Sequence, residues 1–248
     1  MYTDTKAIVF RQIKTVSGRR MIVLFSEKYG KISAGTSINE RSKGKNALSL
    51  RPFCCGRYEL FKGRDSYSIN GAEVIRSFYS LGEDVDKYMA ASYVLELTDS
   101  VLAEGEPQPG IFRLLEEFLE LMEQRKTACR TLVTGYQIRL LSLLGLGLSL
   151  KTCVRCGKEI TGPAVLSVAE GGLVCGACAQ PSDDVNPLNF ALSADIISML
   201  AYMQEHPIRS LKDLAVPEDK QVLMDRVLSR YISYHLGIGN LKSEGLRI

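Results

Sequence analysis

The sequence predicts an α+β protein in which a small β-barrel precedes an α-helical domain, and a cysteine ribbon is inserted among the helices. In the first third of the chain, short apolar segments alternate with glycine-containing charged turns. The apolar spacing then changes to the helical period. Two Cys-x-x-Cys pairs lie close together in the second half. We therefore expect a barrel domain over residues 1–80, a helical domain over 81–150 and 184–248, and a ribbon over 151–183.

Five strands are expected in the barrel. They cover residues 6–15, 21–25, 32–36, 52–62 and 67–75. The polar segment 39–51 is expected to be a mobile surface loop because it is rich in charge and glycine. Phe10, Phe25 and Phe61 are expected in the core. Five short strands with basic loops are typical of the OB-fold, a small Greek-key barrel that binds nucleic acids and sugars.

The charge of the chain is unevenly distributed. Residues 1–80 hold 15 Lys and Arg against 6 Asp and Glu, a net of +9, which leaves −6 for the rest because the whole chain carries +3. A basic barrel predicts a polyanionic ligand. Barrels of this kind bind single-stranded nucleic acids in a basic groove, where aromatic side chains stack on the bases. Tyr29 is a candidate for stacking. The candidate DNA-binding residues are Arg11, Lys14, Arg19, Arg20, Lys28, Lys31, Arg41, Lys43, Lys45 and Arg51.

Helices are expected over residues 84–101, 111–124, 128–144, 193–205 and 218–236. Neither His206 nor His235 stands near a Ser, Cys or carboxylate in a catalytic pattern, and Glu116-Glu117 and Asp183-Asp184 are expected to be surface carboxylates. The sequence contains no phosphate-binding glycine motif and no His-Glu-x-x-His. We therefore expect a binding protein and not an enzyme.

The two cysteine pairs have the spacing of a four-thiolate zinc site. Cys153 and Cys156 form the first pair, and Cys175 and Cys178 form the second. Zn²⁺ prefers tetrahedral sulfur ligation, and four protein ligands leave no open position, so the expected Zn²⁺ is structural. Gly157 and Gly176 suit tight turns at the two pairs. A ribbon of about thirty residues is too small to hold a core without its metal.

Two other uses of these cysteines are disfavoured. A disulfide requires an oxidising compartment, and a redox Cys-x-x-Cys stands alone beside a βαβ pattern. The remaining cysteines, Cys54, Cys55 and Cys129, have no ligand spacing and are expected to act as small buried apolar residues. The first residues lack the pattern of a signal peptide, and the longest apolar run, 140–150, is too short to span a membrane. A cytoplasmic location without membrane contact is expected.

Three stretches in this order resemble the bacterial recombination-mediator family RecO. The first is the segment 23–34, followed by the basic loop and Leu50-Arg51-Pro52-Phe53. The second is the helix end at 144–148 just before the four-cysteine ribbon, and the third is the segment 231–237 with Leu241-Lys242-Ser243. Together they span nearly the whole chain. The turn at 16–20 departs from the family, which usually has a more acidic hairpin there.

The resemblance implies an OB-fold, a helical domain and a zinc-binding insertion whose four cysteines match this chain one by one. It implies binding of single- and double-stranded DNA, annealing of complementary strands, and cooperation with RecR in loading RecA onto strands coated by single-strand-binding protein. A nucleoid association follows from that role. The family also binds the acidic C-terminal tail of single-strand-binding protein on its helices, for which Arg130 and Arg139 are the candidate rim residues.

Two functions of other classes stay open at this point. A zinc-ribbon nuclease would need acidic metal ligands near the basic face, and residues 1–80 contain six carboxylates without a paired motif. A protein-interaction scaffold would use the barrel to bind protein in place of DNA. Salt-dependent binding to a bare oligonucleotide separates the scaffold from the DNA-binding protein.

Overall fold

The structure, a computed structural model, describes residues 1–15, 20–38, 45–64, 66–184, 186–239, 241 and 243, and the side chains at 45, 46 and 184 lie outside the described set. The chain divides into two compact units, one built around Met1–Glu123 and the other around Gln124–Leu241. The first unit therefore combines the barrel with the helices expected over residues 84–101 and 111–124.

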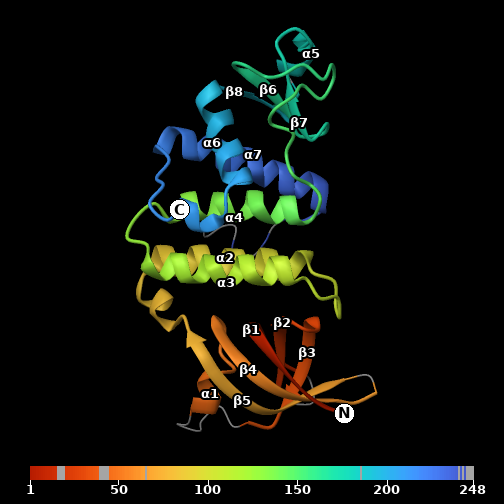
Figure 1. Cartoon of the computed structure of the whole chain (residues 1–248), viewed down its shortest axis with the longest axis vertical. Helices are drawn as coiled ribbons and strands as arrows, with labels where there is room; N and C mark the ends of the chain where they lie inside the picture. The colour runs from red at the N-terminus through yellow and green to blue at the C-terminus, as the bar shows by residue number, and fades with distance from the viewer. Residues whose placement is uncertain are drawn as a thin grey trace. The chain divides into compact units, whose positions relative to one another are not determined.

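Five strands close into a barrel in the order β1-β2-β3-β5-β4 (Figure 1). They are β1 (Tyr2–Lys14), β2 (Arg20–Ser26), β3 (Gly30–Thr36), β4 (Cys54–Lys62) and β5 (Tyr67–Ser77). Neighbours pair antiparallel except β3 and β5, which run parallel. The predicted fold class is thereby confirmed, and β1 begins four residues earlier than expected.

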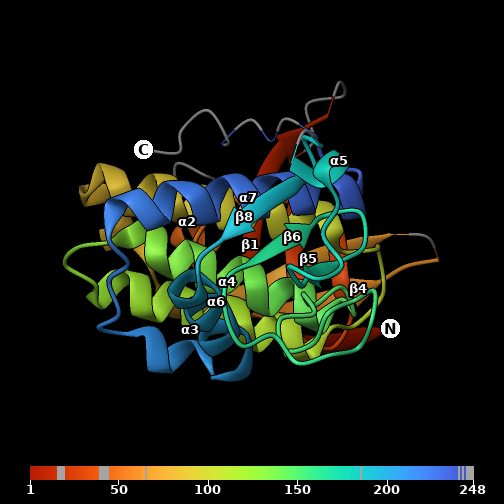
Figure 2. The same cartoon turned by 90° about the horizontal axis from the view of Figure 1, so that it is seen from above.

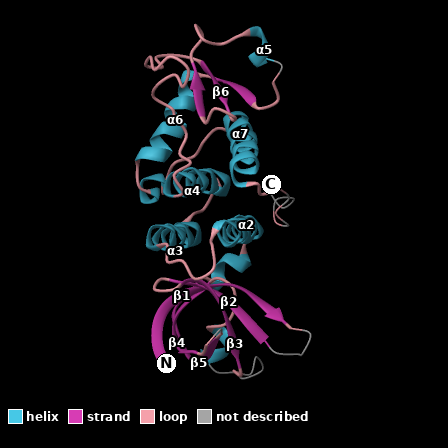
Figure 3. Cartoon of the chain, turned by 90° about the vertical axis from the view of Figure 1, so that its right-hand side faces the viewer, coloured by secondary structure: helices cyan, strands magenta, loops and turns pink. Residues whose placement is uncertain are grey.

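The middle of β1 is buried on both faces. Residues 7–10 are all buried, although side chains alternate along a strand. One face fills the barrel, and the other lies under α2 (Val85–Val101) and α3 (Pro109–Gln124), which run side by side over the strands (Figure 3). Phe25 of β2 links the two layers, with its ring centroid 5.3 Å from that of Phe112 on α3. Because β1 and β2 are buried on both faces, their sequences contain continuous runs of apolar residues in place of an alternating pattern.

Residues 45–51 do not form the exposed loop that was expected. They contain the short helix α1 (Lys45–Leu48), and Leu50 lies in the barrel core with no exposed surface. The buried Tyr58 hydroxyl donates to the Ser49 carbonyl, and Gln12 Nε2 donates to the Leu50 carbonyl over 2.7 Å. An apolar side chain within a polar segment thus fixes this end of the loop to the barrel. Residues 39–44 lie outside the described residues.

The second unit is helical with a small sheet. Its elements are α4 (Cys129–Leu143), β6 (Ala164–Ser167), β7 (Gly172–Val174), α5 (Pro181–Asp184), β8 (Asn189–Leu192), α6 (Ala194–Glu205), the 3-10 turn η2 (Ile208–Leu211) and α7 (Glu218–Leu236). α4 is central, as expected, and packs on α6 and α7. The strands form one sheet in the order β7-β6-β8. Figure 2 shows β6 and β8 side by side. β8, which was not predicted, carries this sheet past residue 183.

The predicted helix ends are accurate to within two residues. Asp84 precedes α2, and its side chain accepts from the Lys87 N–H, which is the usual role of an N-terminal cap. A 3-10 turn, η1 (Tyr79–Glu83), joins β5 to this cap. No helix within the described ranges is both long and apolar enough to cross a membrane.

Gly30 marks a close approach between the barrel and the loop that joins α2 to α3. Its φ is +67°, and a Cβ at this position would overlap the Glu106 carbonyl group. The Gly105 N–H donates to the Lys31 carbonyl over 2.9 Å in the same place. Glycine is required here by both the backbone conformation and the lack of space.

Gly30→Ala should therefore lower the free energy of unfolding by about 3 kcal/mol, since backbone strain and overpacking add. Urea denaturation followed by circular dichroism measures the change. Gly82→Ala is the matched control, because its Cβ would meet open space, and it should stay within about 0.5 kcal/mol of the parent chain. Equal midpoints for the two variants would contradict the close approach at Gly30.

Candidate metal centre and nucleic-acid interface

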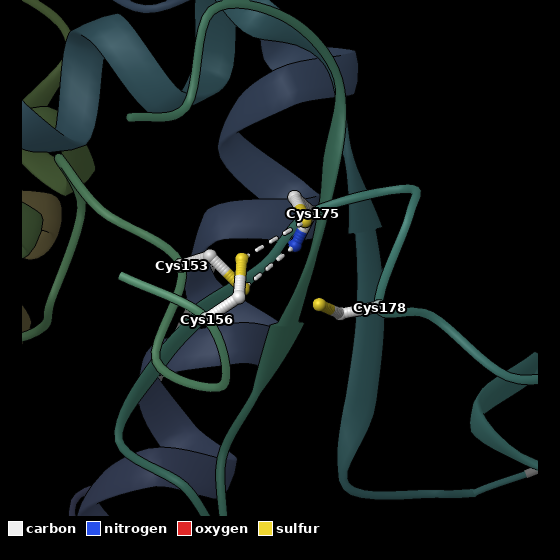
Figure 4. A group of neighbouring side chains, drawn as sticks. All are labelled: Cys153, Cys156, Cys175 and Cys178. Atoms are coloured by element: carbon white, nitrogen blue, oxygen red, sulfur yellow. Dashed lines mark hydrogen bonds between the residues drawn. The ribbon is translucent and has the colours of Figure 1, made fainter. Parts of the chain in front are cut away.

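The four predicted cysteines converge in the second unit. Their sulfur atoms all lie within 4.8 Å of one another, and the Cys156 and Cys175 sulfurs are 3.8 Å apart. Figure 4 shows Cys153, Cys156, Cys175 and Cys178 directed into one small space. A tetrahedral zinc with Zn–S bonds of about 2.3 Å needs sulfurs about 3.8 Å apart. The donor set and its spacing therefore fit a tetrahedral thiolate metal site.

Backbone N–H groups surround the most buried of these sulfurs. The Cys175 N–H donates to Cys153 Sγ over 3.4 Å. Burial would raise the pKa of the Cys153 thiol, but the N–H groups of Cys175, Cys156 and Arg155 outweigh it and lower the pKa to about 6. A thiol that ionises this readily is suited to bind a cation, because the thiolate is the metal ligand. Hydrogen bonds with the neighbouring thiols Cys156 and Cys175 raise the pKa of Cys178 to about 12.

Only one of the two predicted glycine turns requires glycine. Gly157 has a φ of +72°, and its N–H donates to the Cys153 carbonyl over 2.9 Å, which closes the first turn. Gly176 does not adopt a positive φ, and the second turn is closed by the Cys178 N–H donating to the Cys175 carbonyl. The two Cys-x-x-Cys turns are therefore built differently.

Arg155, inside the first Cys-x-x-Cys turn, connects the two halves of the site. Its guanidinium donates to Glu170 and Asp183 over 2.8 Å each, and to the Cys178 carbonyl over 2.9 Å. These contacts hold the pKa of Asp183 at about 2. The prediction that Asp183 is a solvated surface carboxylate is wrong, since the residue is 7 % exposed and also accepts from the Gln180 N–H. The sequence analysis did not single out Arg155. Its position between the two ligands Cys153 and Cys156 could have indicated a role in the site.

The other three cysteines lie apart from this cluster. Cys54 and Cys55 are fully buried in the barrel unit. Burial raises the pKa of the Cys54 thiol to about 11 and that of Cys55 to about 12. Both are therefore protonated, unreactive thiols near neutral pH, in keeping with the role expected for them.

Two of the predicted DNA-binding residues face α2. Arg11 Nε lies 2.8 Å from Asp99 Oδ2 on that helix. Lys31 Nζ donates to the Asp99 carbonyl over 2.7 Å and lies 3.4 Å from Oδ1, and its side chain is only 15 % exposed. A single carboxylate thus serves both cations, and the Arg11 side chain stays 54 % exposed. Lys28, on the turn between β2 and β3, is exposed and donates to the Asp4 carbonyl over 2.7 Å.

Three other predicted residues lie near the junction of β1 and β2, where Arg51 follows Leu50, whose carbonyl accepts from Gln12 of β1. Lys14 and Arg20 stand opposite each other in the strand register. Arg20 donates to the Ile38 carbonyl over 3.0 Å and to Gln12, while its buried Nε has no partner. Lys14 and Arg51 are exposed, and neither pairs with a carboxylate within the described part of the chain. We call Lys14, Arg20 and Arg51 the basic rim.

The remaining predicted DNA contacts lie outside the described residues. They are Arg19, Arg41 and Lys43, together with the side chain of Lys45, whose backbone begins α1. Gln12 links the two described segments that flank these positions. Its side chain accepts from Arg20 of β2 and donates to the carbonyl of Leu50, which directly precedes Arg51. The rim is thus held by contacts between β1, β2 and the segment that ends at Arg51.

Arg130 and Arg139, the candidate rim residues for a partner tail, are engaged within the second unit. Arg130 binds Asp225 and Glu218 of α7, with Nε 3.0 Å from Asp225 Oδ2. Arg139 Nη1 donates to the Gln204 carbonyl over 2.6 Å. A separate pocket of about 460 Å³ is lined by Gln124, Arg125, Lys126, Thr127, Lys212, Asp213 and Ala215. The guanidinium of Arg125 is buried there and donates to carbonyl groups, including that of Leu211 over 2.8 Å.

The closed basic barrel, the helices and the four-thiol cluster define a class, the OB-barrel proteins that bind nucleic acids. Two family descriptions match the chain: "Recombination protein O N terminal" over residues 1–78 and "Recombination protein O C terminal" over residues 82–245. The chain therefore belongs to the RecO family of DNA repair and recombination proteins.

Relatives match over nearly the whole chain. A DNA repair protein RecO of Alkaliphilus metalliredigens is 30 % identical, over 98 % of this chain and 97 % of the relative. A DNA repair protein RecO of Desulforamulus reducens is 30 % identical over 93 % of this chain and 88 % of the relative. A DNA repair protein RecO of Acetivibrio thermocellus is 26 % identical over 95 % of this chain and 92 % of the relative. The family resemblance expected from the three sequence stretches is confirmed.

Cys175→Ser should abolish most metal binding, because a hydroxyl is a poor replacement for one of four thiolates. The parent protein, purified without chelator, should contain about one zinc per chain by elemental analysis. Cys129→Ser is the control, since Cys129 lies outside the cluster, and it should keep its zinc. Unchanged zinc content in Cys175→Ser would contradict the four-thiolate site.

Arg155→Lys should weaken metal retention although the charge is kept, because lysine cannot bridge two carboxylates and a carbonyl at once. Loss of a group that orients the ligands typically costs 10–100-fold in metal affinity. Competition with a chromogenic chelator measures it. Lys158→Arg, an exposed change in the same ribbon, should have no effect. A parent-like affinity in Arg155→Lys would show that Arg155 does not support the ligands.

Proposed function

We propose that this protein is a recombination mediator that binds single- and double-stranded DNA through its barrel and promotes annealing of complementary strands. Its action is non-covalent. Annealing requires that the repulsion between two phosphate backbones be reduced and that the strands be held close together. No bond needs to be made or broken by the protein.

The observation that carries the proposal is the basic rim. Lys14 and Arg51 are exposed cations without a carboxylate partner among the described residues, and Arg20, opposite Lys14 in the register, is held by hydrogen bonds to Gln12 and the Ile38 carbonyl. Such cations bind phosphates without regard to base sequence and release counterions, so the affinity falls as salt rises. Other predicted DNA contacts neighbour the rim in the sequence. Arg19 directly precedes Arg20, and the polar segment 39–51, which ends at Arg51, contains Arg41, Lys43 and Lys45.

The four cysteines are proposed to hold one structural Zn²⁺. Cys153, Cys156, Cys175 and Cys178 would supply all four ligands, and the metal would stabilise the ribbon without taking part in any reaction. The hydrogen bonds of Arg155 would keep the two turns at ligand distance. The zinc should thus matter for the fold of the second unit and not for DNA contacts of the barrel.

RecR, RecA and the C-terminal tail of single-strand-binding protein are proposed as partners. The protein would cooperate with RecR to load RecA on coated single strands in the cytoplasm, close to the nucleoid. Arg130 and Arg139 stay the proposed rim for the acidic tail. The tail would have to compete with Asp225 and Glu218 for Arg130, so binding there should be weak and sensitive to salt.

Annealing of two complementary labelled oligonucleotides, coated with single-strand-binding protein, tests the proposal. The protein should accelerate annealing without nucleotide or added metal, and the acceleration should fade as salt rises. Binding to a bare oligonucleotide is measured alongside. Absence of both activities would favour the protein-interaction scaffold, and shortened strands would favour the nuclease.

Lys14→Glu with Arg51→Glu should lower single-strand affinity at low salt by tenfold or more. The slope of log affinity against log salt should fall by about 1.4, because each lost phosphate contact contributes about 0.7 on single strands. The control is Lys158→Glu with Arg226→Glu, two exposed cations of the second unit with the same change in net charge. Equal losses in both variants would mean that only net charge matters and that the rim is no specific contact.

A further inference from the structure

Two large aromatic side chains lie exposed on the outside of the barrel. Tyr2 of β1 is 73 % exposed, and Phe61 of β4 is 39 % exposed, so the prediction that Phe61 packs in the core is wrong. The two residues stand directly opposite each other in the antiparallel register. Their ring centroids are 5.2 Å apart in an edge-to-face arrangement. The pair forms a small aromatic platform, and no described helix covers it.

More rings and a cation lie at the same end of the barrel, but on the inner side of β4 and β5, because side chains alternate along a strand. Lys62 follows Phe61, and its ammonium lies 5.6 Å from the ring centroid of Tyr67, the residue paired with it on β5. The Tyr67 ring is 5.9 Å from that of Tyr29, which was the stacking candidate. Tyr29 is half-buried, and its hydroxyl lies 2.6 Å from Thr3 Oγ1. Tyr29 therefore supports the barrel, whereas Tyr2 and Phe61 offer the accessible faces.

The charges around the platform differ on its two sides. Lys62 and Arg64 are exposed at the end where β4 turns into β5. In the opposite direction along the strands, Asp4 and Glu59 stand opposite each other in the register next to the rings. Lys28 lies 3.7 Å from Asp4 and partly compensates it. A bound polyanion should therefore direct its phosphates toward Lys62 and Arg64 and away from the carboxylates.

We propose that Tyr2 and Phe61, with Lys62 and Arg64, form a stacking subsite for unpaired bases. This inference rests on the proposed DNA binding and adds a basis for strand selection to it. Aromatic rings stack on the faces of any base, and cations beside them hold the phosphates. In a duplex the base faces are hidden by stacking on one another, so this platform serves single strands only. The basic rim, at the other end of β1, serves both forms.

The test compares two double variants. The alanine pair carries Tyr2→Ala and Phe61→Ala, and the leucine pair carries Tyr2→Leu and Phe61→Leu. Binding to a dT12 single strand and to a 12-base-pair duplex is followed by fluorescence anisotropy at fixed salt. The alanine pair should lose tenfold or more in single-strand affinity, with duplex affinity within twofold and the salt slope unchanged. The leucine pair keeps apolar bulk without a π-face, and it should behave like the alanine pair.

An abasic 12-mer backbone provides a second readout, and its comparison with dT12 on the parent chain requires no variant. The parent chain should bind it more weakly than dT12, and the alanine pair should bind the two ligands equally. An unchanged single-strand affinity in the alanine pair, a full rescue by leucine, or an equal loss on the duplex would each overturn the stacking subsite while leaving DNA binding in place. A parent chain that binds neither strand form would overturn the proposed function itself.

Discussion

The outer surface of β1 and β2 is divided between helices and solvent, and this division decides which charges of the barrel can meet a ligand. Under α2 and α3, Phe10, Phe25 and Phe112 form a second apolar layer outside the barrel. Burying such rings contributes about 2 kcal/mol each, so the helices are firmly attached. Cations at the border of this layer are paired with helical carboxylates. Cations beyond it, at the basic rim, are left for an external anion.

The ribbon depends on a different kind of interaction. Its three short strands bury aliphatic side chains such as Leu166 and Leu173, and its turns are joined by the contacts of one guanidinium. Arg155 binds two carboxylates and a carbonyl, and Asp183 in turn binds Gln180 and Asn189. A hydrogen-bonded network of this kind orients ligands before a metal arrives. The ribbon thus combines apolar packing with a polar network beside its four-thiol cluster, whereas the barrel is organised by apolar packing.

Local patterns in the sequence were enough for the five barrel strands, the long helices and the four cysteines, because periodicity and ligand spacing are properties of neighbouring residues. Pairings across the fold were not accessible in this way. Nothing near Arg11 or Lys31 in the sequence indicates that Asp99 forms an ion pair with each of them, and Arg130 binds Asp225 from far along the chain. Phe61 and Leu50 were assigned to the wrong environments for a related reason. Whether an apolar residue is buried depends on which face of its strand the helices cover, and on where a loop returns to the barrel.

The anchoring of Leu50 has a consequence for the entropy of binding. Fixing the backbone of a residue costs about 1–2 kcal/mol in conformational freedom. In the segment that ends at Arg51, Ser49 and Leu50 are already immobilised by the barrel core and by bonds from Tyr58 and Gln12. Arg51 therefore projects from a backbone whose ordering was completed when the protein folded. A phosphate that reaches it gains the attraction of the cation without the loss that a wholly free loop would incur on binding.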